Sequence, residues 1–167
     1  RMARVAVKHV GETFQSRVAV LLPDADGALR SLHADAGEAA LDDPDLSIAH
    51  WVFDHGRPAG LGTDALPGAP AIYLPLRGSE RILGVLAVLP SNSRRVLLPE
   101  QRHLLDTFAG QIALAIERAL LATRAETARV AAETESLRNT LLSSISHDLR
   151  TPLSVITGAS TALADPQ

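Results

Sequence analysis

The fold of this chain is decided by residues 72–89, which read IYLPLRGSERILGVLAVL. Two aliphatic runs, residues 72–76 and 82–89, flank a short polar segment that contains Gly78. Apolar runs on both sides of such a turn are typical of a β-hairpin. We therefore expect two antiparallel strands here, joined through residues 77–81.

A second hairpin is predicted earlier in the chain. Residues 18–22 are aliphatic throughout, as expected for a buried strand, and they end at the sequence PDADG, residues 23–27. Proline, aspartate and glycine favour tight turns. We expect residues 28–33 to form the return strand, and the small and acidic residues 34–44 to form a loop.

Helices are predicted on both sides of these strands. Apolar residues at helical spacing predict a helix over residues 1–10 and a short one over 45–55. Residues 56–70 are dense in Gly and Pro and are expected to form a loop with room for one short strand. Hairpins with helices at both ends indicate an α+β fold, here an antiparallel sheet flanked by helices.

A long helix is predicted after the sheet and after a polar loop at residues 91–95. From Pro99 to Thr151 the only residue that disfavours a helix is Gly110. A periodic stretch of this length without internal stops is typical of a coiled coil or a helical connector. Its middle part carries a thin seam at three- and four-residue steps, formed by Leu120, Thr123, Thr127, Val130, Thr134, Leu137 and Leu141.

The candidate site is the sequence SHDLRTPL at residues 146–153. His147 lies two positions from apolar residues on either side, so at ~100° per residue it is predicted to face away from the apolar stripe. Asp148 is the nearest group that could fix one ring nitrogen of the imidazole while the other attacks a phosphoryl group. Thr151 shares the histidine's face, and Pro152 is expected to bend the helix.

Residues 147–153 resemble the phosphoacceptor box of the sensor histidine kinases of two-component systems. The resemblance implies that His147 is the autophosphorylated residue, that Asp148 is its acid/base partner, and that Thr151 positions water when the same protein dephosphorylates its response regulator. An ordinary exposed histidine on a surface helix is the alternative interpretation of this stretch.

The part before the helix resembles a GAF domain, a sensory module of signalling proteins. Residues 51–67, WVFDHGRPAGLGTDALP, are most similar to the GAF region of KdpD-type potassium sensor kinases, as are residues 74–76 and 84–86. On this basis we expect a GAF-like sensory domain over 1–115, a coiled-coil connector over 116–136, and the truncated first helix of a phosphoacceptor/dimerisation domain over 137–167.

The resemblance also implies partners and a location. The parent protein would be a bacterial inner-membrane kinase controlling potassium uptake, with this chain in its cytoplasmic portion and attached to the membrane only through segments outside it. A homodimer, a KdpE-like response regulator and an ATP-binding domain of the same protein are the implied partners. ATP and Mg are implied for that domain alone, so residues 1–167 are expected to be inactive by themselves and to hold no cofactor.

The composition of the chain excludes several kinds of binding site. A formal net charge of −3 gives no basic footprint for nucleic acid, and the absence of cysteine excludes thiolate metal sites and disulfides. The alternative function is a GAF module that binds a small molecule or dimerises, without activity of its own. The sequence does not identify the ligand of such a module, and no bound metal ion is expected in it.

Several residues near the expected GAF cavity are weaker candidates. His50 and His55 could ligate haem or a metal, although hydrogen-bonded or exposed histidines are the commoner case. Arg57, Arg77 and Arg81 could face an anionic ligand, although solvated arginines are the default expectation. Trp51 and Phe53 are expected in the core, and the segment Gly60-Leu61-Gly62 is expected to form a turn rather than a phosphate loop.

Overall fold

The computed structural model describes residues 2–31 and 45–163, with side chains for residues 8–31, 45–94, 96–142 and 145. The expected loop at 34–44 therefore lies outside the described residues. The elements in chain order are α1 (Met2–Phe14), β1 (Ser16–Pro23), β2 (Leu29–Ser31), α2 (Leu46–His55), β3 (Ala59–Gly60), β4 (Ile72–Arg77), β5 (Ile82–Pro90), α3 (Ser93–Val96) and α4 (Pro99–Leu163).

The chain divides into two compact units, residues 1–120 and 121–167. The first unit holds the strands, the helices α1 to α3 and the first part of α4. The second unit contains the remainder of α4, which is helical as far as Leu163.

The first unit is built on a five-stranded sheet in the order β2-β1-β5-β4-β3. Each pair of neighbouring strands is antiparallel, and the β1–β5 pairing runs from Ser16 opposite Pro90 to Leu21 opposite Val85. Both expected hairpins, β1–β2 and β4–β5, are present. The predicted α+β fold with an antiparallel sheet is confirmed.

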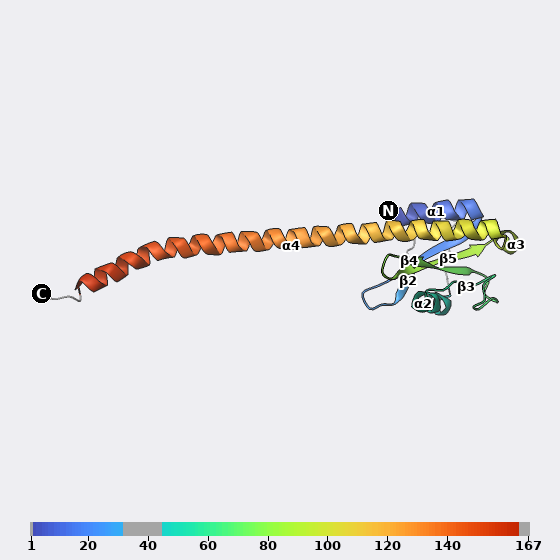
Figure 1. The fold of residues 1–167 in the computed structure, drawn as a ribbon, viewed down its shortest axis with the longest axis horizontal. Coiled ribbons are helices and arrows are strands. Elements are labelled where there is room, and N and C mark those ends of the chain that lie inside the picture. Colours follow the sequence, from blue (N-terminus) through green and yellow to red (C-terminus); the bar gives the residue numbers. More distant parts are fainter. Residues whose placement is uncertain (1, 32–44, 164–167) are drawn as a thin grey trace. The chain divides into compact units, whose positions relative to one another are not determined.

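The two faces of the sheet form two separate hydrophobic cores, because successive strand residues point to opposite faces. On one face, Val18, Leu74 and Leu86 pack with α1 and with Leu105 and Ile112 of α4. The other face carries smaller side chains and packs against α2, with the members Ala19, Leu21, Leu29, Ala49, Val52, Ala59, Ala71, Tyr73, Val85 and Ala87. Figure 1 shows α1 and the start of α4 on one side of the sheet and α2 on the other.

Helix α2 has a cap at each end that its sequence encodes. The Asp45 carboxylate accepts hydrogen bonds from the backbone N–H groups of Ser47 and Ile48, at 2.9 and 3.3 Å. Gly56 ends the helix in the left-handed conformation, with φ of 61°, and donates to the carbonyl of Val52. The short strand expected in the following Gly/Pro-rich loop is β3.

The polar segment at 91–95 differs from expectation, because part of it forms the short helix α3. The side chain of Asn92 accepts a hydrogen bond from the backbone of Arg94 at 3.1 Å, which supports the first turn. Helix α4 begins at Pro99, where proline is tolerated, and remains helical through Pro152. No helix within residues 2–31 and 45–163 combines the length and apolarity that a membrane span requires.

Candidate functional site

The predicted phosphoacceptor stretch lies within α4. The backbone of His147, Asp148 and Thr151 is helical, which places His147 and Thr151 one turn apart on the same helix face. Their side chains lie outside the described residues. The outward presentation of His147 and the roles of the three residues therefore remain predictions.

The part of α4 that leads to this stretch carries exposed apolar side chains. Leu137 is 66% exposed, Leu141 is 62% exposed and Ile145 is 54% exposed. Two threonines of the seam, Thr127 and Thr134, donate to the carbonyls four residues earlier, at 2.9 and 2.8 Å. Their hydroxyl groups are thus satisfied within the helix, and the apolar members of the seam are left without cover in a single chain.

A charged cluster occupies the same segment of α4. Arg129 donates to Glu126 through Nε and Nη2, at 3.1 and 2.9 Å, and through Nη1 to Glu133. The hydrogen bond from Arg129 lowers the pKa of the Glu126 carboxyl group. These side chains are exposed on the helix, so the cluster contributes modestly to helix stability.

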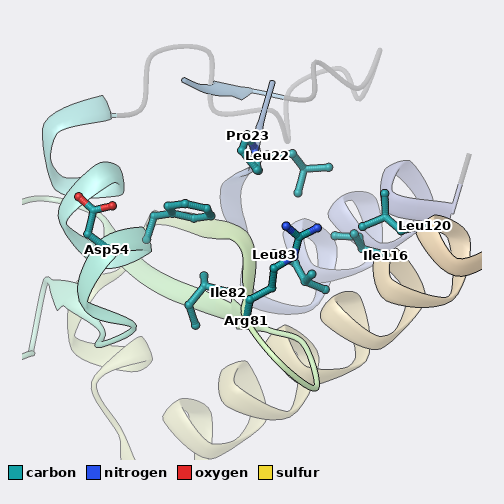
Figure 2. A pocket seen from close by; sticks show the side chains of 9 residues that line it. Leu22, Pro23, Asp54, Arg81, Ile82, Leu83, Ile116 and Leu120 are labelled. Carbon is teal, nitrogen blue, oxygen red and sulfur yellow. The ribbon is translucent and has the colours of Figure 1, made fainter. Parts of the chain in front are cut away.

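A cavity of about 590 Å³ lies within the first unit. Its lining comes from the end of β1, the last turn of α2, the start of β5 and α4, and consists of Leu22, Pro23, Phe53, Asp54, Arg81, Ile82, Leu83, Ile116 and Leu120. Figure 2 shows the Arg81 guanidinium in the middle of these side chains and Asp54 on α2 at their margin. The cavity is mostly apolar, with one cation and one carboxylate in its lining.

The structure does not bring the three candidate arginines together. Arg81 lines the cavity described above, whereas Arg77 donates through Nη2 to the carbonyl of Gly56 and borders a second cavity of about 290 Å³ beside Asp106. Arg57 is exposed and is in the lining of neither cavity. Of the three, Arg81 is therefore the candidate for an anionic ligand.

The two candidate histidines are held by their own helix. In each of His50 and His55, Nδ1 lies 2.8 Å from the carbonyl oxygen four residues earlier, so Nδ1 is the protonated nitrogen. The His55 ring also stacks on Trp51, with a centroid separation of 4.4 Å. Trp51 and Phe53 are half-buried against the hydrophobic core between the sheet and α2. The described residues contain no cluster of three or more potential metal ligands.

The segment Gly60-Leu61-Gly62 is a turn, as predicted. Gly60 and Gly62 have φ values of 94° and 66°, and the hydroxyl of Thr63 donates to the Gly60 carbonyl at 2.7 Å. Arg102 of α4 donates to the Gly62 carbonyl at 3.0 Å, which fixes the turn against the helix. The backbone N–H groups of Gly60 and Leu61 donate to the carbonyls of Ala65 and Ala71, so much of this turn is bonded within the protein.

Glu117 was not identified from the sequence. Its Oε1 accepts from the backbone N–H of Ser79 at 2.8 Å, and its Oε2 accepts from the Ser79 hydroxyl at 3.0 Å. These bonds fasten the β4–β5 turn to α4, close to the cavity. No local sequence signal connects two residues that lie 38 positions apart.

Two domain families match the chain. Residues 2–118 match the GAF domain, and residues 137–167 match the His Kinase A (phospho-acceptor) domain. The second match contains the whole stretch from His147 to Leu153. The chain thus has the organisation of a GAF sensor followed by the start of a histidine kinase phosphoacceptor domain.

Curated relatives resemble nearly the whole chain. Sensor protein KdpD of Escherichia coli is 46% identical over 157 residues, which are 94% of this chain and 17% of the relative. Sensor protein KdpD of Clostridium acetobutylicum is 33% identical over 96% of this chain and 18% of the relative. The chain therefore spans less than a fifth of the length of these relatives.

Solved structures resemble the first unit. The GAF domain of the potassium sensor histidine kinase KdpD from Escherichia coli has a TM-score of 0.63 and 42% identity, covering 74% of this chain and 85% of that one. The GAF-B domain of DevS from Mycobacterium smegmatis has a TM-score of 0.53 and 25% identity, covering 72% of this chain and 94% of that one. The chain belongs to the GAF domain family, and over nearly its full length it is similar to KdpD sensor proteins.

Proposed function

We propose that this chain is the cytoplasmic sensory and phosphoacceptor part of a KdpD-type sensor histidine kinase, and that His147 is its phosphorylation site. The proposal is supported by the phospho-acceptor match over residues 137–167, the segment that contains His147. The similarity to KdpD sensor proteins over 94% of the chain supports the same assignment. By the same similarity, the parent protein would be an inner-membrane kinase that controls potassium uptake.

The proposed reaction uses the two ring nitrogens of His147 differently. One nitrogen attacks the γ-phosphorus of ATP, so that an N–P bond forms while the bond from phosphorus to the bridging oxygen breaks and ADP leaves. Asp148 accepts the imidazole proton and holds the ring in the reactive tautomer. A carboxylate oxygen of the response regulator then attacks the phosphorus, and the N–P bond breaks.

Thr151 is assigned to the reverse function, the removal of phosphate from the response regulator. In the proposal, the hydroxyl of this residue, four positions after His147, orients a water molecule toward the aspartyl phosphate. ATP and Mg would be held by a separate ATP-binding domain of the same protein, and the response regulator would be KdpE-like. A Thr151→Ala variant should therefore retain phosphorylation of His147 and lose phosphatase activity.

Dimerisation is proposed through the exposed seam of α4. Leu137, Leu141 and Ile145 expose more than half of their side chains, which is unfavourable for an isolated helix in water. Pairing with the same seam of a second copy would cover them. Analytical ultracentrifugation should show a dimer that Leu137→Glu together with Leu141→Glu converts to a monomer.

The test of phosphoryl acceptance supplies an ATP-binding domain in trans. The chain is mixed with the ATP-binding domain of a KdpD relative and radiolabelled ATP, and acid-labile label on the chain is measured. Label should be lost in His147→Gln and retained in His103→Gln, which changes an exposed histidine elsewhere on α4. Equal label in the two variants would refute the assignment of His147.

The second candidate function is a small-molecule-binding GAF module without phosphoacceptor activity. The cavity of about 590 Å³ in the first unit favours it, since ligand pockets in proteins have this size. Ligand binding without any acid-labile phosphate in the trans assay would select this function.

A further inference from the structure

The cavity beside Arg81, which supports the second candidate function, also has features that indicate the chemical class of its ligand. It lies where four elements of the first unit meet, at the end of the sheet at which β1 finishes and β5 begins. Leu21 is paired with Val85 in the sheet, so the next residue, Leu22, lies over Gly84. A Cβ atom on Gly84 would approach Leu22 to 2.6 Å and the Leu21 carbonyl oxygen to 2.3 Å, so this wall is closely packed.

The walls of the cavity are mainly aliphatic and aromatic. Leu83 and Ile116 are buried, and Leu22 and Ile82 are half-buried with side chains in the lining. The charged side chains in the lining are Arg81 and Asp54, and Figure 2 places the guanidinium centrally and the carboxylate at the margin. Arg81 and Asp54 are exposed, so this is an open apolar pocket with one cation in its lining. Such a pocket favours a ligand that has an apolar body and a negative charge.

Arg81 has no competing partner within the described part of the chain. Its guanidinium makes no hydrogen bond and no ion pair there, whereas Arg30, Arg77, Arg102 and Arg129 each donate to a carboxylate or a backbone carbonyl. The nearby carboxylate of Glu117 is already occupied by Ser79. The five donors of the Arg81 guanidinium are therefore available to an anion.

The backbone that carries Arg81 is fixed. Its carbonyl accepts a hydrogen bond from the N–H of Gly78 at 2.9 Å, which closes the β4–β5 turn. The same turn is fastened to α4 by the two bonds from Ser79 to Glu117. A preorganised attachment reduces the conformational entropy that the arginine loses when a ligand binds.

We propose that this cavity binds a small amphipathic anion. The apolar body of the ligand lies against Leu22, Ile82 and Ile116, and its carboxylate or phosphate accepts hydrogen bonds from the planar guanidinium of Arg81. Binding requires neither phosphorylation of His147 nor the ATP-binding domain. The binding experiment therefore tests this proposal independently of the assignment of the chain to a kinase.

The test is isothermal titration calorimetry of the whole chain with four probes that share one apolar tail. Decanoate and decyl phosphate carry the two possible anionic heads, and decanol and decyltrimethylammonium are the neutral and cationic controls. All are used below the concentrations at which they form micelles. The anions should bind, and whichever of them binds more tightly identifies the head group; equal binding of all four probes, or no binding of either anion, would overturn the proposal.

Three variants test the place of binding. Arg81→Gln should weaken the binding of the anions about tenfold, as expected for loss of a charge-assisted hydrogen bond. Arg94→Gln is the matched control, because Arg94 follows the other end of β5, beyond nine strand residues or about 30 Å of strand. Ile82→Trp fills the cavity and should abolish binding. An unchanged affinity in both Arg81→Gln and Ile82→Trp would refute the site.

Discussion

Substitution of Glu117 by alanine should weaken the first unit by releasing the β4–β5 turn from α4. The Glu117 carboxylate accepts two hydrogen bonds from Ser79, one from the backbone N–H at 2.8 Å and one from the hydroxyl at 3.0 Å. Both bonds are lost in Glu117→Ala. The turn then depends on its own hydrogen bond between Gly78 and Arg81.

The size of the effect follows from the exposure of the pair. Hydrogen bonds to charged groups contribute about 1.5–3 kcal/mol each when they are buried. Ser79 is exposed and Glu117 is half-buried, so water replaces part of each bond. We therefore expect the free energy of unfolding to fall by about 1–2 kcal/mol in Glu117→Ala, and by about half of that in Ser79→Ala, which removes only the hydroxyl bond.

Urea unfolding followed by the fluorescence of Trp51 measures this change. Trp51 is the single tryptophan of the chain and lies in the first unit, so its signal reports that unit. With a slope of about 2 kcal/mol per molar urea, the midpoint should fall by about 0.5–1 M. The matched control is Glu135→Ala, which alters an exposed glutamate of α4 that has no partner among the described residues.

A double variant separates the pair from its surroundings. If Ser79 acts through Glu117, Ser79→Ala should add almost nothing to the effect of Glu117→Ala, because the bond is already absent. Fully additive losses, or a Glu117→Ala midpoint equal to that of Glu135→Ala, would refute the reasoning.

Three further predictions concern other parts of the chain. Gly60→Ala should lower the free energy of unfolding by about 2–3 kcal/mol, since φ is 94° and the new Cβ would lie 2.1 Å from a backbone oxygen. In the control Gly68→Ala the new Cβ has no atom within 4 Å, so the free energy of unfolding should change little. Urea unfolding measures both variants. The hydrogen bond from Arg30 lowers the pKa of Asp24 in the folded protein. The bond therefore stabilises the fold fully at a pH above the pKa of Asp24 in the unfolded chain. This stabilisation is lost as the pH falls through the lower pKa of Asp24 in the folded protein. NMR titration should show the Asp24 pKa rising in Arg30→Gln. One residue inserted after Val130 rotates the following helix by ~100° and should change autophosphorylation of the intact kinase; an unchanged rate would contradict this.

The local sequence pattern was sufficient to predict the two hairpins. The sequence PDADG at 23–27 predicted a turn, and the structure closes it with a hydrogen bond from Asp24 N–H to Ala28 and a φ of 83° at Gly27. The strand limits were less predictable, because they depend on partners. β1 extends back to Ser16 since its first residues pair with the end of β5, whereas β2 is limited to Leu29–Ser31.

Long-range contacts could not be predicted in the same way. Arg57, Arg77 and Arg81 look alike in the sequence, and only the fold shows that Arg77 is engaged by Gly56 while Arg81 lines a cavity. The attachment of Glu117 to Ser79 is likewise created by packing between α4 and the hairpin. Helical spacing gave no reason to distinguish this glutamate from other polar residues of the helix.

The β4–β5 turn connects the cavity to α4 through a single short segment. Ser79 fastens the turn to Glu117, and Arg81, two residues later, lines the cavity. Ile116 is buried in the core, whereas Leu121 is 57% exposed, so Glu117 lies at the last turn of α4 that the first unit packs against. Arg81 and Ser79 belong to the same turn, so a ligand that also strengthens the Ser79–Glu117 bonds is linked to them thermodynamically. By that linkage, any anion whose binding strengthens the Ser79–Glu117 bonds must bind more weakly when Glu117 is removed.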